Sequence, residues 1–176
     1  MEQKERWVMP ENRAIILRRI IRDTMGPKYY RTLVFVDVEA KGPAPCQGTM
    51  TEWGAIHPLT RSEFYATLAT EDEHGAFIRF DTWLRKLTAP GRPRFVSDNP
   101  AYDWQWMNDG FWRNLGYNPF GFSARRIGDF YAGLTGNFAK AVQWKKLRVT
   151  EHDHNPTNDA LGNVEAWERM LIGGRG

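Results

Sequence analysis

The sequence predicts an α/β domain with a mixed central sheet flanked by helices, and three observations lead to this prediction. Residues 32–39 form an apolar run rich in β-branched side chains, which is too short to favour a helix and predicts a buried strand. Strand-like segments at residues 50–57 and 63–70 follow, separated by a short turn that is typical of a hairpin. The rest of the chain alternates helical and strand patterns. Three strands joined in antiparallel order, followed by parallel strands, are therefore expected.

The other elements are predicted from helical periodicity and from the glycine and proline residues that end it. Residues 11–23 place apolar side chains at helical spacing between arginines, after a proline that suits a first turn. Residues 25–30 are expected to be a turn or linker and residues 40–49 a loop, because both contain a Gly-Pro pair. Further along, the patterns predict a helix at residues 76–87, a strand at 94–97, a helix from 98 to about 115, a strand at 120–123, a helix at 127–134 and a last helix at 155–172.

The chain is expected to divide into an N-terminal helical extension with its linker, at residues 1–30, and one main domain at residues 31–176. A length of 176 residues suits a single hydrophobic core. The apolar stripe of the helix at residues 11–23 is expected to pack on that core. A basic helix that docks on a partner or on a membrane surface is the alternative.

Composition indicates a soluble protein that works inside the cell. Hydrophobic residues make up 41% and charged residues 26% of the chain, and no apolar run approaches the roughly 20 residues that span a bilayer. The single Cys46 cannot form an internal disulfide, and residues 1–6 lack the apolar centre of a secretory signal. A cytoplasmic location without membrane attachment is therefore expected. The net charge of +3 permits a polyanionic partner without requiring one.

Two carboxylates lie on the most apolar predicted strand. Asp37 and Glu39 are two residues apart, and the period of two in a strand points both side chains to the same face. Two carboxylates forced together repel and raise a pKa, whereas a divalent cation keeps both ionised as oxygen ligands. A metal site is one interpretation of the pair, and a strand end exposed to water is the other.

A third carboxylate, Asp103, lies on the first turn of the helix that follows the strand at residues 94–97. At that junction a carboxylate can face the mouth of the sheet. The alternative is that Asp98 or Asn99 caps the helix and Asp103 is a favourable charge on the helix dipole. For Asp98 the capping interpretation is preferred.

The segment before the last helix contains a histidine and a fourth carboxylate. Asn155 is a suitable N-cap and Pro156 suits the first helical position. His154 then lies just outside the helix and Asp159 one turn inside it, which is close enough for both to serve one site.

The order and spacing of these residues resemble the DEDDh exonuclease family of the ribonuclease H-like superfamily, which includes ribonuclease T, oligoribonuclease and proofreading exonuclease domains. The family pattern is Asp-x-Glu on the first strand, Asn-x-x-x-Asp at a later strand-to-helix junction and His-x-x-x-x-Asp near the last helix. Residues 51–56 also resemble the family's second strand, and the resemblance spans about residues 32–169. The pattern is filled in this chain by Asp37 and Glu39, by Asn99 and Asp103, and by His154 and Asp159.

The resemblance implies a ribonuclease H-like fold and a two-metal phosphodiester hydrolase. Asp37 would bridge two divalent cations, Glu39 and Asp159 would complete the first site, and Asp103 would support the second. Carboxylate oxygens suit Mg²⁺ or Mn²⁺. His154 would accept the proton of the attacking water as general base.

The expected reaction is 3′→5′ removal of mononucleotides from single-stranded RNA or DNA with a free 3′ end. A likeness to small phage and bacterial exoribonucleases favours RNA slightly over DNA. Related exonucleases are often dimers, so a homodimer is one expected arrangement. This sequence departs from the family in having Asp98-Asn99-Pro100 where many members have His-Asn-Ala, and in a first loop without the commoner Thr-Thr-Gly.

Side chains that could contact a nucleic acid lie near these motifs, although most are expected to be core or surface residues. Aromatic rings that could stack on a base are Trp53, Tyr102, Trp104, Trp106, Phe111 and Trp112. Basic side chains that could follow a phosphate backbone are Arg125, Arg126, Lys140, Lys145, Lys146 and Arg148. Two alternatives stay open: a non-catalytic nucleic-acid-binding or partner-docking domain on the same fold, and a ribonuclease H-like endonuclease. The complete residue set argues against the first, and the histidine motif argues against the second.

Overall fold

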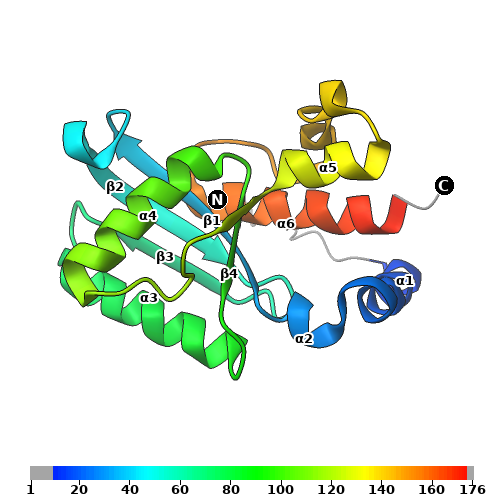
Figure 1. Ribbon diagram of the computed structural model, residues 1–176, viewed down its shortest axis with the longest axis horizontal. Helices are drawn as coiled ribbons and strands as arrows, with labels where there is room; N and C mark the ends of the chain where they lie inside the picture. Colours follow the sequence, from blue (N-terminus) through cyan, green and yellow to red (C-terminus); the bar gives the residue numbers. More distant parts are fainter. Residues whose placement is uncertain (1–9, 174–176) are drawn as a thin grey trace, which may run out of the picture.

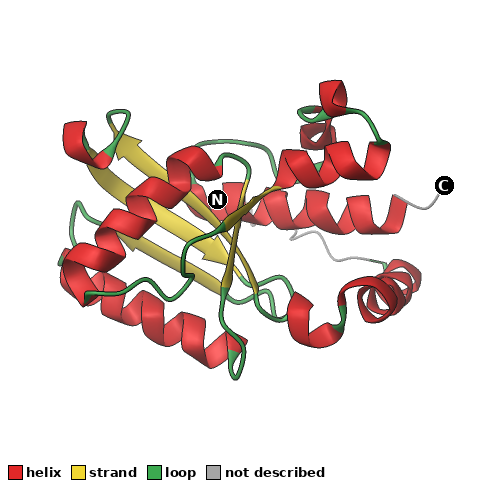
Figure 2. Cartoon of the chain, in the orientation of Figure 1, coloured by secondary structure: helices red, strands yellow, loops and turns green. Residues whose placement is uncertain are grey.

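The computed structural model describes residues 10–173 and contains one five-stranded sheet with helices on both faces (Figures 1 and 2). The strands are β1 (Leu33–Lys41), β2 (Thr49–Ile56), β3 (Glu63–Thr67), β4 (Arg94–Ser97) and β5 (Ala124–Arg126). The α-helices are α1 (Glu11–Ile20), α2 (Pro27–Tyr30), α3 (Glu73–Thr88), α4 (Pro100–Leu115), α5 (Ile127–Thr135) and α6 (Pro156–Gly173). Shorter turns are the π-helical η1 (Ile21–Met25) and the 3₁₀ turns η2 (Pro45–Gln47), η3 (Phe138–Lys140) and η4 (Gln143–Leu147).

The sheet is mixed, with strand order β3-β2-β1-β4-β5. β1 pairs antiparallel with β2, and β2 pairs antiparallel with β3. β4 lies parallel to β1 on its other side, and β5 lies parallel to β4. The predicted α/β class and the predicted succession of antiparallel and then parallel strands are confirmed. This arrangement is consistent with a ribonuclease H-like exonuclease fold.

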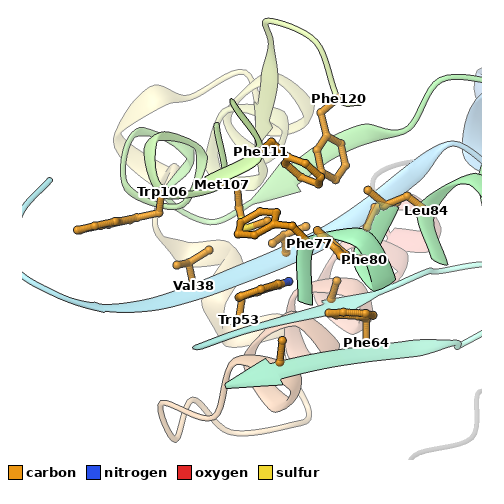
Figure 3. Close-up of a cluster of buried hydrophobic side chains, with 14 of the residues drawn as sticks. Val38, Trp53, Phe64, Phe77, Phe80, Leu84, Trp106, Met107, Phe111 and Phe120 are labelled. Atoms are coloured by element: carbon orange, nitrogen blue, oxygen red, sulfur yellow. The ribbon is translucent and has the colours of Figure 1, made fainter. Parts of the chain in front are cut away.

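Alternating side chains of β1 enter two different cores. Val34, Val36 and Val38 face α3 and α4, whereas Leu33 and Phe35 face α6. This alternation is the period of two expected of a strand that is buried on both sides. The first core is dominated by aromatic rings. Figure 3 shows its labelled members: Val38, Trp53, Phe64, Phe77, Phe80, Leu84, Trp106, Met107, Phe111 and Phe120.

The N-terminal extension contributes to the second core. Leu17, Ile20 and Ile21 are buried in the same cluster as Trp167 of α6. Ile16, the other large apolar residue of the predicted stripe, is exposed. Core packing is thus the interpretation that the described part of the helix supports. Residues 1–9 of the extension lie outside the described residues, and its division from the main domain at residue 30 stays a prediction.

A partly buried ion pair and a buried hydrogen bond connect the β2–β3 turn and α2 to α6. Arg61 Nη2 lies 2.5 Å from Oε2 of Glu168, and the Tyr30 hydroxyl donates to Oε1 of the same carboxylate at 3.2 Å. Burial raises the pKa of Glu168, and Arg61 opposes that rise. Within residues 10–173, no helix has the length and apolar character needed to cross a bilayer.

Two predicted elements are wrong in detail. The fifth strand covers Ala124–Arg126 and not residues 120–123. Phe120 is instead buried in the aromatic core, and Gly121, with a φ of 82°, turns the chain there. Residues 27–30 form the short helix α2 and not a linker, because the carbonyl of Gly26 accepts the N–H groups of the next turn.

Candidate active site

Asp37 and Glu39 lie in the second half of β1, on the face that Leu33 and Phe35 turn toward α6. Both side chains are partly buried. The prediction that they share one face is therefore confirmed. Asp37 is paired with Gly54 of the neighbouring strand β2. A Cβ on Gly54 would point toward the first turn of α6.

Gly54 allows the first turn of α6 to reach the sheet. A Cβ at this position would lie 2.6 Å from the carbonyl oxygen of Pro156 and closer still to backbone atoms of Pro156 and Thr157. Real Cβ atoms do not approach backbone that closely, so a side chain here would displace the helix. The close approach brings Asp159 beside β1. Carboxylate oxygens of Asp37, Glu39 and Asp159 lie within 4.8 Å of one another.

The start of α6 is formed as the sequence predicts. The side chain of Asn155 accepts the N–H groups of Thr157 at 3.1 Å and Asn158 at 3.2 Å, and Pro156 is the first helical residue. Asp153 accepts the Asn155 N–H at 3.1 Å and the Asn158 side-chain amide at 2.8 Å. The loop that contains both nearby histidines is thereby attached to the first turn of the helix.

Asp103 reaches the same region from α4. Because β4 pairs with β1 only as far as Phe35, the edge of β1 is open beyond that point. There Asp103 Oδ1 accepts the Val38 N–H at 3.1 Å. Carboxylate oxygens of Asp37, Asp98 and Asp103 lie within 4.8 Å of one another.

The position of Asp98 corrects the sequence interpretation. Asp98 was expected to cap α4, but the N-cap position is Asn99, whose side chain makes no capping hydrogen bond within the part of the chain that the structure describes. Asp98 instead directly follows the end of β4 and precedes the N-cap residue, and its carboxylate lies beside that of Asp37. We refer to Asp37, Glu39, Asp98, Asp103 and Asp159 together as the acidic cluster.

Crowding of these carboxylates opposes their ionisation. Burial, and then the charges of Asp103 and Asp159, raises the pKa of Asp37 to about 9. Burial also raises the pKa of Asp103 to about 7, with the Asp98 charge acting in the same direction. The pKa of Glu39 is raised by burial, and His154 opposes that rise. A cation at the acidic cluster would reverse these shifts, because it favours the ionised carboxylates.

Two basic side chains partly balance the acidic cluster. Arg148 Nη2 lies 2.7 Å from Oδ1 of Asp159, and Lys145 Nζ lies 3.0 Å from Oδ2 of Asp98. Arg148 was expected to be a surface charge that could follow a phosphate backbone. Its side chain is buried, so this expectation is wrong, and its guanidinium faces the acidic cluster and α6.

Two histidines lie at the edge of the acidic cluster. His154 Nδ1 is 3.5 Å from Glu39 Oε1, and its side chain is 79% exposed. The backbone of His154 has a φ of 59°, a left-handed conformation that is uncommon for residues other than glycine. His152 Nδ1 lies 3.3 Å from Asp159 Oδ2. The ring centroids of His152 and His154 are 4.6 Å apart. Both rings can therefore reach the site, each beside a different carboxylate.

The aromatic residues near the motifs belong mostly to the core, as expected. Trp53, Trp106 and Phe111 are buried. Tyr102 is half-buried, and its hydroxyl donates to the Ala40 carbonyl at 3.2 Å. Trp112 is exposed.

The acidic cluster fits divalent cations that prefer oxygen ligands. Among residues 10–173, Oδ2 of Asp103 and Oδ2 of Asp159 are buried and accept no hydrogen bond, although His152 Nδ1 lies 3.3 Å from the Asp159 oxygen. Buried carboxylate oxygens without partners are costly unless a positive group binds them. All the donors are carboxylates, which suits Mg²⁺ or Mn²⁺ better than zinc.

The fold and the acidic cluster together describe the class: an α/β domain with a mixed sheet, consistent with a ribonuclease H-like exonuclease fold, and a carboxylate centre able to hold metal ions. No protein-family model matches the chain. Among curated proteins, the chain is similar to the 3′-5′ DNA exonuclease Cap18 of Escherichia coli, with 26% identity over 170 residues. The match covers 76% of this chain and 88% of that protein. The similarity supports an exonuclease family and a nuclease activity.

Proposed function

We propose that this protein is a metal-dependent 3′→5′ exonuclease that releases mononucleotides from single-stranded nucleic acid. The observation that carries the proposal is the convergence of Asp37, Glu39, Asp103 and Asp159 from β1, α4 and α6. The similarity to a named exonuclease supports the same conclusion. Both groups of close carboxylates contain Asp37, so Asp37 would be a ligand common to both cations.

In the proposed mechanism, Mg²⁺ or Mn²⁺ ions supply charge stabilisation and an acidified water when bound. Glu39 and Asp159 would hold a cation together with Asp37 on the α6 side, and Asp103 would hold one on the α4 side. Arg148 holds Asp159 through Oδ1, and Oδ2 lies 3.3 Å from His152 Nδ1.

His154 accepts the proton of the attacking water. Its Nδ1 faces Glu39, so Nε2 is the nitrogen available for this proton. The exposed position of the ring suits a base that must meet water and substrate at the mouth of the site. Glu39 and the backbone after it are proposed to contact the terminal 3′-hydroxyl.

The substrate is proposed to be a single strand, because a terminal base must leave its stack to reach the recessed carboxylates. The sequence resemblance favours RNA slightly. The E. coli relative is named for activity on DNA, which supports DNA as the first substrate to test.

The test is digestion of 3′-labelled and 5′-labelled oligomers of DNA and RNA, single- and double-stranded, with Mg²⁺, Mn²⁺ or EDTA. We expect stepwise shortening from the 3′ end of single strands, and no hydrolysis in EDTA. A closed single-stranded circle serves as the control. Cleavage of the circle would indicate an endonuclease, and binding of the oligomers without hydrolysis would indicate a non-catalytic domain.

A further inference from the structure

Asp98 is the member of the acidic cluster that the proposed mechanism does not use. It follows β4 directly, and its carboxylate lies within 4.8 Å of those of Asp37 and Asp103. Its side chain is 17% exposed, so the carboxylate is largely shielded from water. Asp98 Oδ2 is 3.0 Å from Lys145 Nζ.

An independent feature of Asp103 indicates that a ligand belongs at this place. Asp103 is 3% exposed, and its Oδ1 is used by the Val38 N–H. Its Oδ2 is buried and, among the described residues, accepts no hydrogen bond of normal geometry, although the nearby Ser97 hydroxyl opposes the rise that burial causes in the pKa of Asp103. A buried carboxylate oxygen in that condition is unfavourable unless a positive group occupies the space beside it.

We propose that Asp98 is a direct ligand of the cation on the α4 side, together with Asp37 and Asp103. Lys145 then provides the charge that balances Asp98 when the cation is absent. This inference rests on the proposed function and adds a residue to its metal centre. It assigns three carboxylates to a cation for which the mechanism above names only two.

The charges and exposures of the residues support the assignment. Three carboxylates at this spacing suit a hard divalent cation, and affinity rises with the number of charged ligands. The Lys145 side chain is 51% exposed, so its ammonium can return to water at little cost. Cation and ammonium therefore compete for Asp98, and binding of the cation releases Lys145.

The test measures Mn²⁺ binding to the full chain by titration calorimetry without nucleic acid. For the wild type we expect two bound ions. Asp98→Asn should weaken one of them by at least about tenfold and leave the other unchanged. Asp129→Asn is the matched control, because Asp129 also forms an ion pair, with Arg126 at 3.0 Å, but lies outside the acidic cluster. It should bind both ions as the wild type does.

Competition with Lys145 provides a second measurement, which does not depend on the folding of Asp98→Asn. Lys145→Met should raise the Mn²⁺ affinity of the site on the α4 side by about two- to fivefold, because it removes the competing ammonium. In the double variant with Asp98→Asn, the same Lys145 change should have no effect.

Unchanged binding of both ions by a folded Asp98→Asn would overturn the assignment, as would unchanged Mn²⁺ affinity in Lys145→Met. Failure of the proposed function has a different result. In that case the wild type would bind no Mn²⁺, or Asp37→Asn would still bind two ions.

Discussion

Arg148 and Asp159 form an ion pair in which both side chains are removed from solvent. Arg148 Nη2 lies 2.7 Å from Asp159 Oδ1, with the side chains 7% and 1% exposed. The guanidinium occupies the space left by Gly162, where a Cβ would lie 2.5 Å from its Nε. Arg148 also donates to the backbone carbonyl of Asp159 at 3.3 Å. The carboxylate of Asp159 is thus held in one orientation before any cation binds.

Loss of Arg148 should destabilise the metal-free protein. Arg148→Met leaves the Asp159 carboxylate buried without its partner, which typically costs about 3–5 kcal/mol. Urea unfolding in EDTA measures the loss of stability. Saturating Mg²⁺ should restore part of the lost stability, because the cation then balances the charge of Asp159. Arg148→Lys should lose less than Arg148→Met. A change below about 1 kcal/mol in EDTA would show that the ion pair does not hold Asp159.

Adding a methyl group at Gly54 should separate α6 from the sheet. The new Cβ meets the backbone of Pro156 and Thr157, so Gly54→Ala should cost about 1–3 kcal/mol or more and lower metal affinity by displacing Asp159. Gly133→Ala is the control, because nothing described lies within 4 Å of a Cβ at that helical position. It should be neutral or stabilising. Equal stability of the two variants in urea unfolding would contradict the close approach of α6.

Stability of the metal-free protein should fall with rising pH through the titration of the acidic cluster. The folded-state pKa of Asp37 is raised to about 9 and that of Asp103 to about 7, above their unfolded values. The contribution of these two carboxyl groups to the free energy of unfolding is therefore complete below about pH 4, where they are protonated. It is lost as pH rises toward 9. We expect the melting temperature in EDTA to decline over this range more steeply for the wild type than for Asp37→Asn.

Saturating Mg²⁺ should remove that decline, because the cation binds the ionised carboxylates. Differential scanning calorimetry at several pH values, with EDTA or Mg²⁺, makes the comparison. Identical pH profiles for the wild type and Asp37→Asn in EDTA would contradict the crowding of charge around Asp37.

Removal of His154 should slow hydrolysis without abolishing metal binding. His154→Ala is expected to reduce the rate by about 10²–10⁴-fold, the usual contribution of a general base, while the carboxylates still hold the cations. His152→Ala is the comparison, because His152 lacks an acidic residue five positions later and should be close to neutral. The structure makes this a strict test, since His152 Nδ1 lies 3.3 Å from Asp159. If His152 proved essential and His154 dispensable, the role given to His154 would pass to its neighbour.

Local sequence patterns predicted most of the fold, because in the strongest elements the local pattern and the tertiary environment favour the same structure. β1 is apolar on both faces and β4 is bounded by Pro93 and Asn99, so both were located from the sequence within one or two residues at each end. β5 was misplaced because Phe120 is apolar for reasons of core packing, which a short run of residues does not distinguish from strand formation.

The acidic cluster was predicted less completely, and Asp98 shows why. An Asp at a strand-to-helix junction suits an N-cap, and local pattern alone favours that role. Two of its charged neighbours, Asp37 of β1 and Lys145, are far away in the sequence. A signal was present, because the carboxyl ends of adjacent parallel strands meet at one edge of a sheet, and Asp98 directly follows β4. Arg148 had no comparable signal, since its burial depends on the space left by Gly162.

The central claim is tested most directly by hydrolysis of a 5′-labelled single-stranded DNA oligomer by the wild type and by Asp37→Asn, each with Mg²⁺ and with EDTA. Asn keeps the shape of Asp37 while removing the charge common to both groups of close carboxylates. We predict a ladder of products shortened from the 3′ end for the wild type with Mg²⁺, and loss of most of that activity in EDTA or in folded Asp37→Asn. Hydrolysis that continues at the wild-type rate both in EDTA and in Asp37→Asn would contradict the account, as would products shortened from the 5′ end.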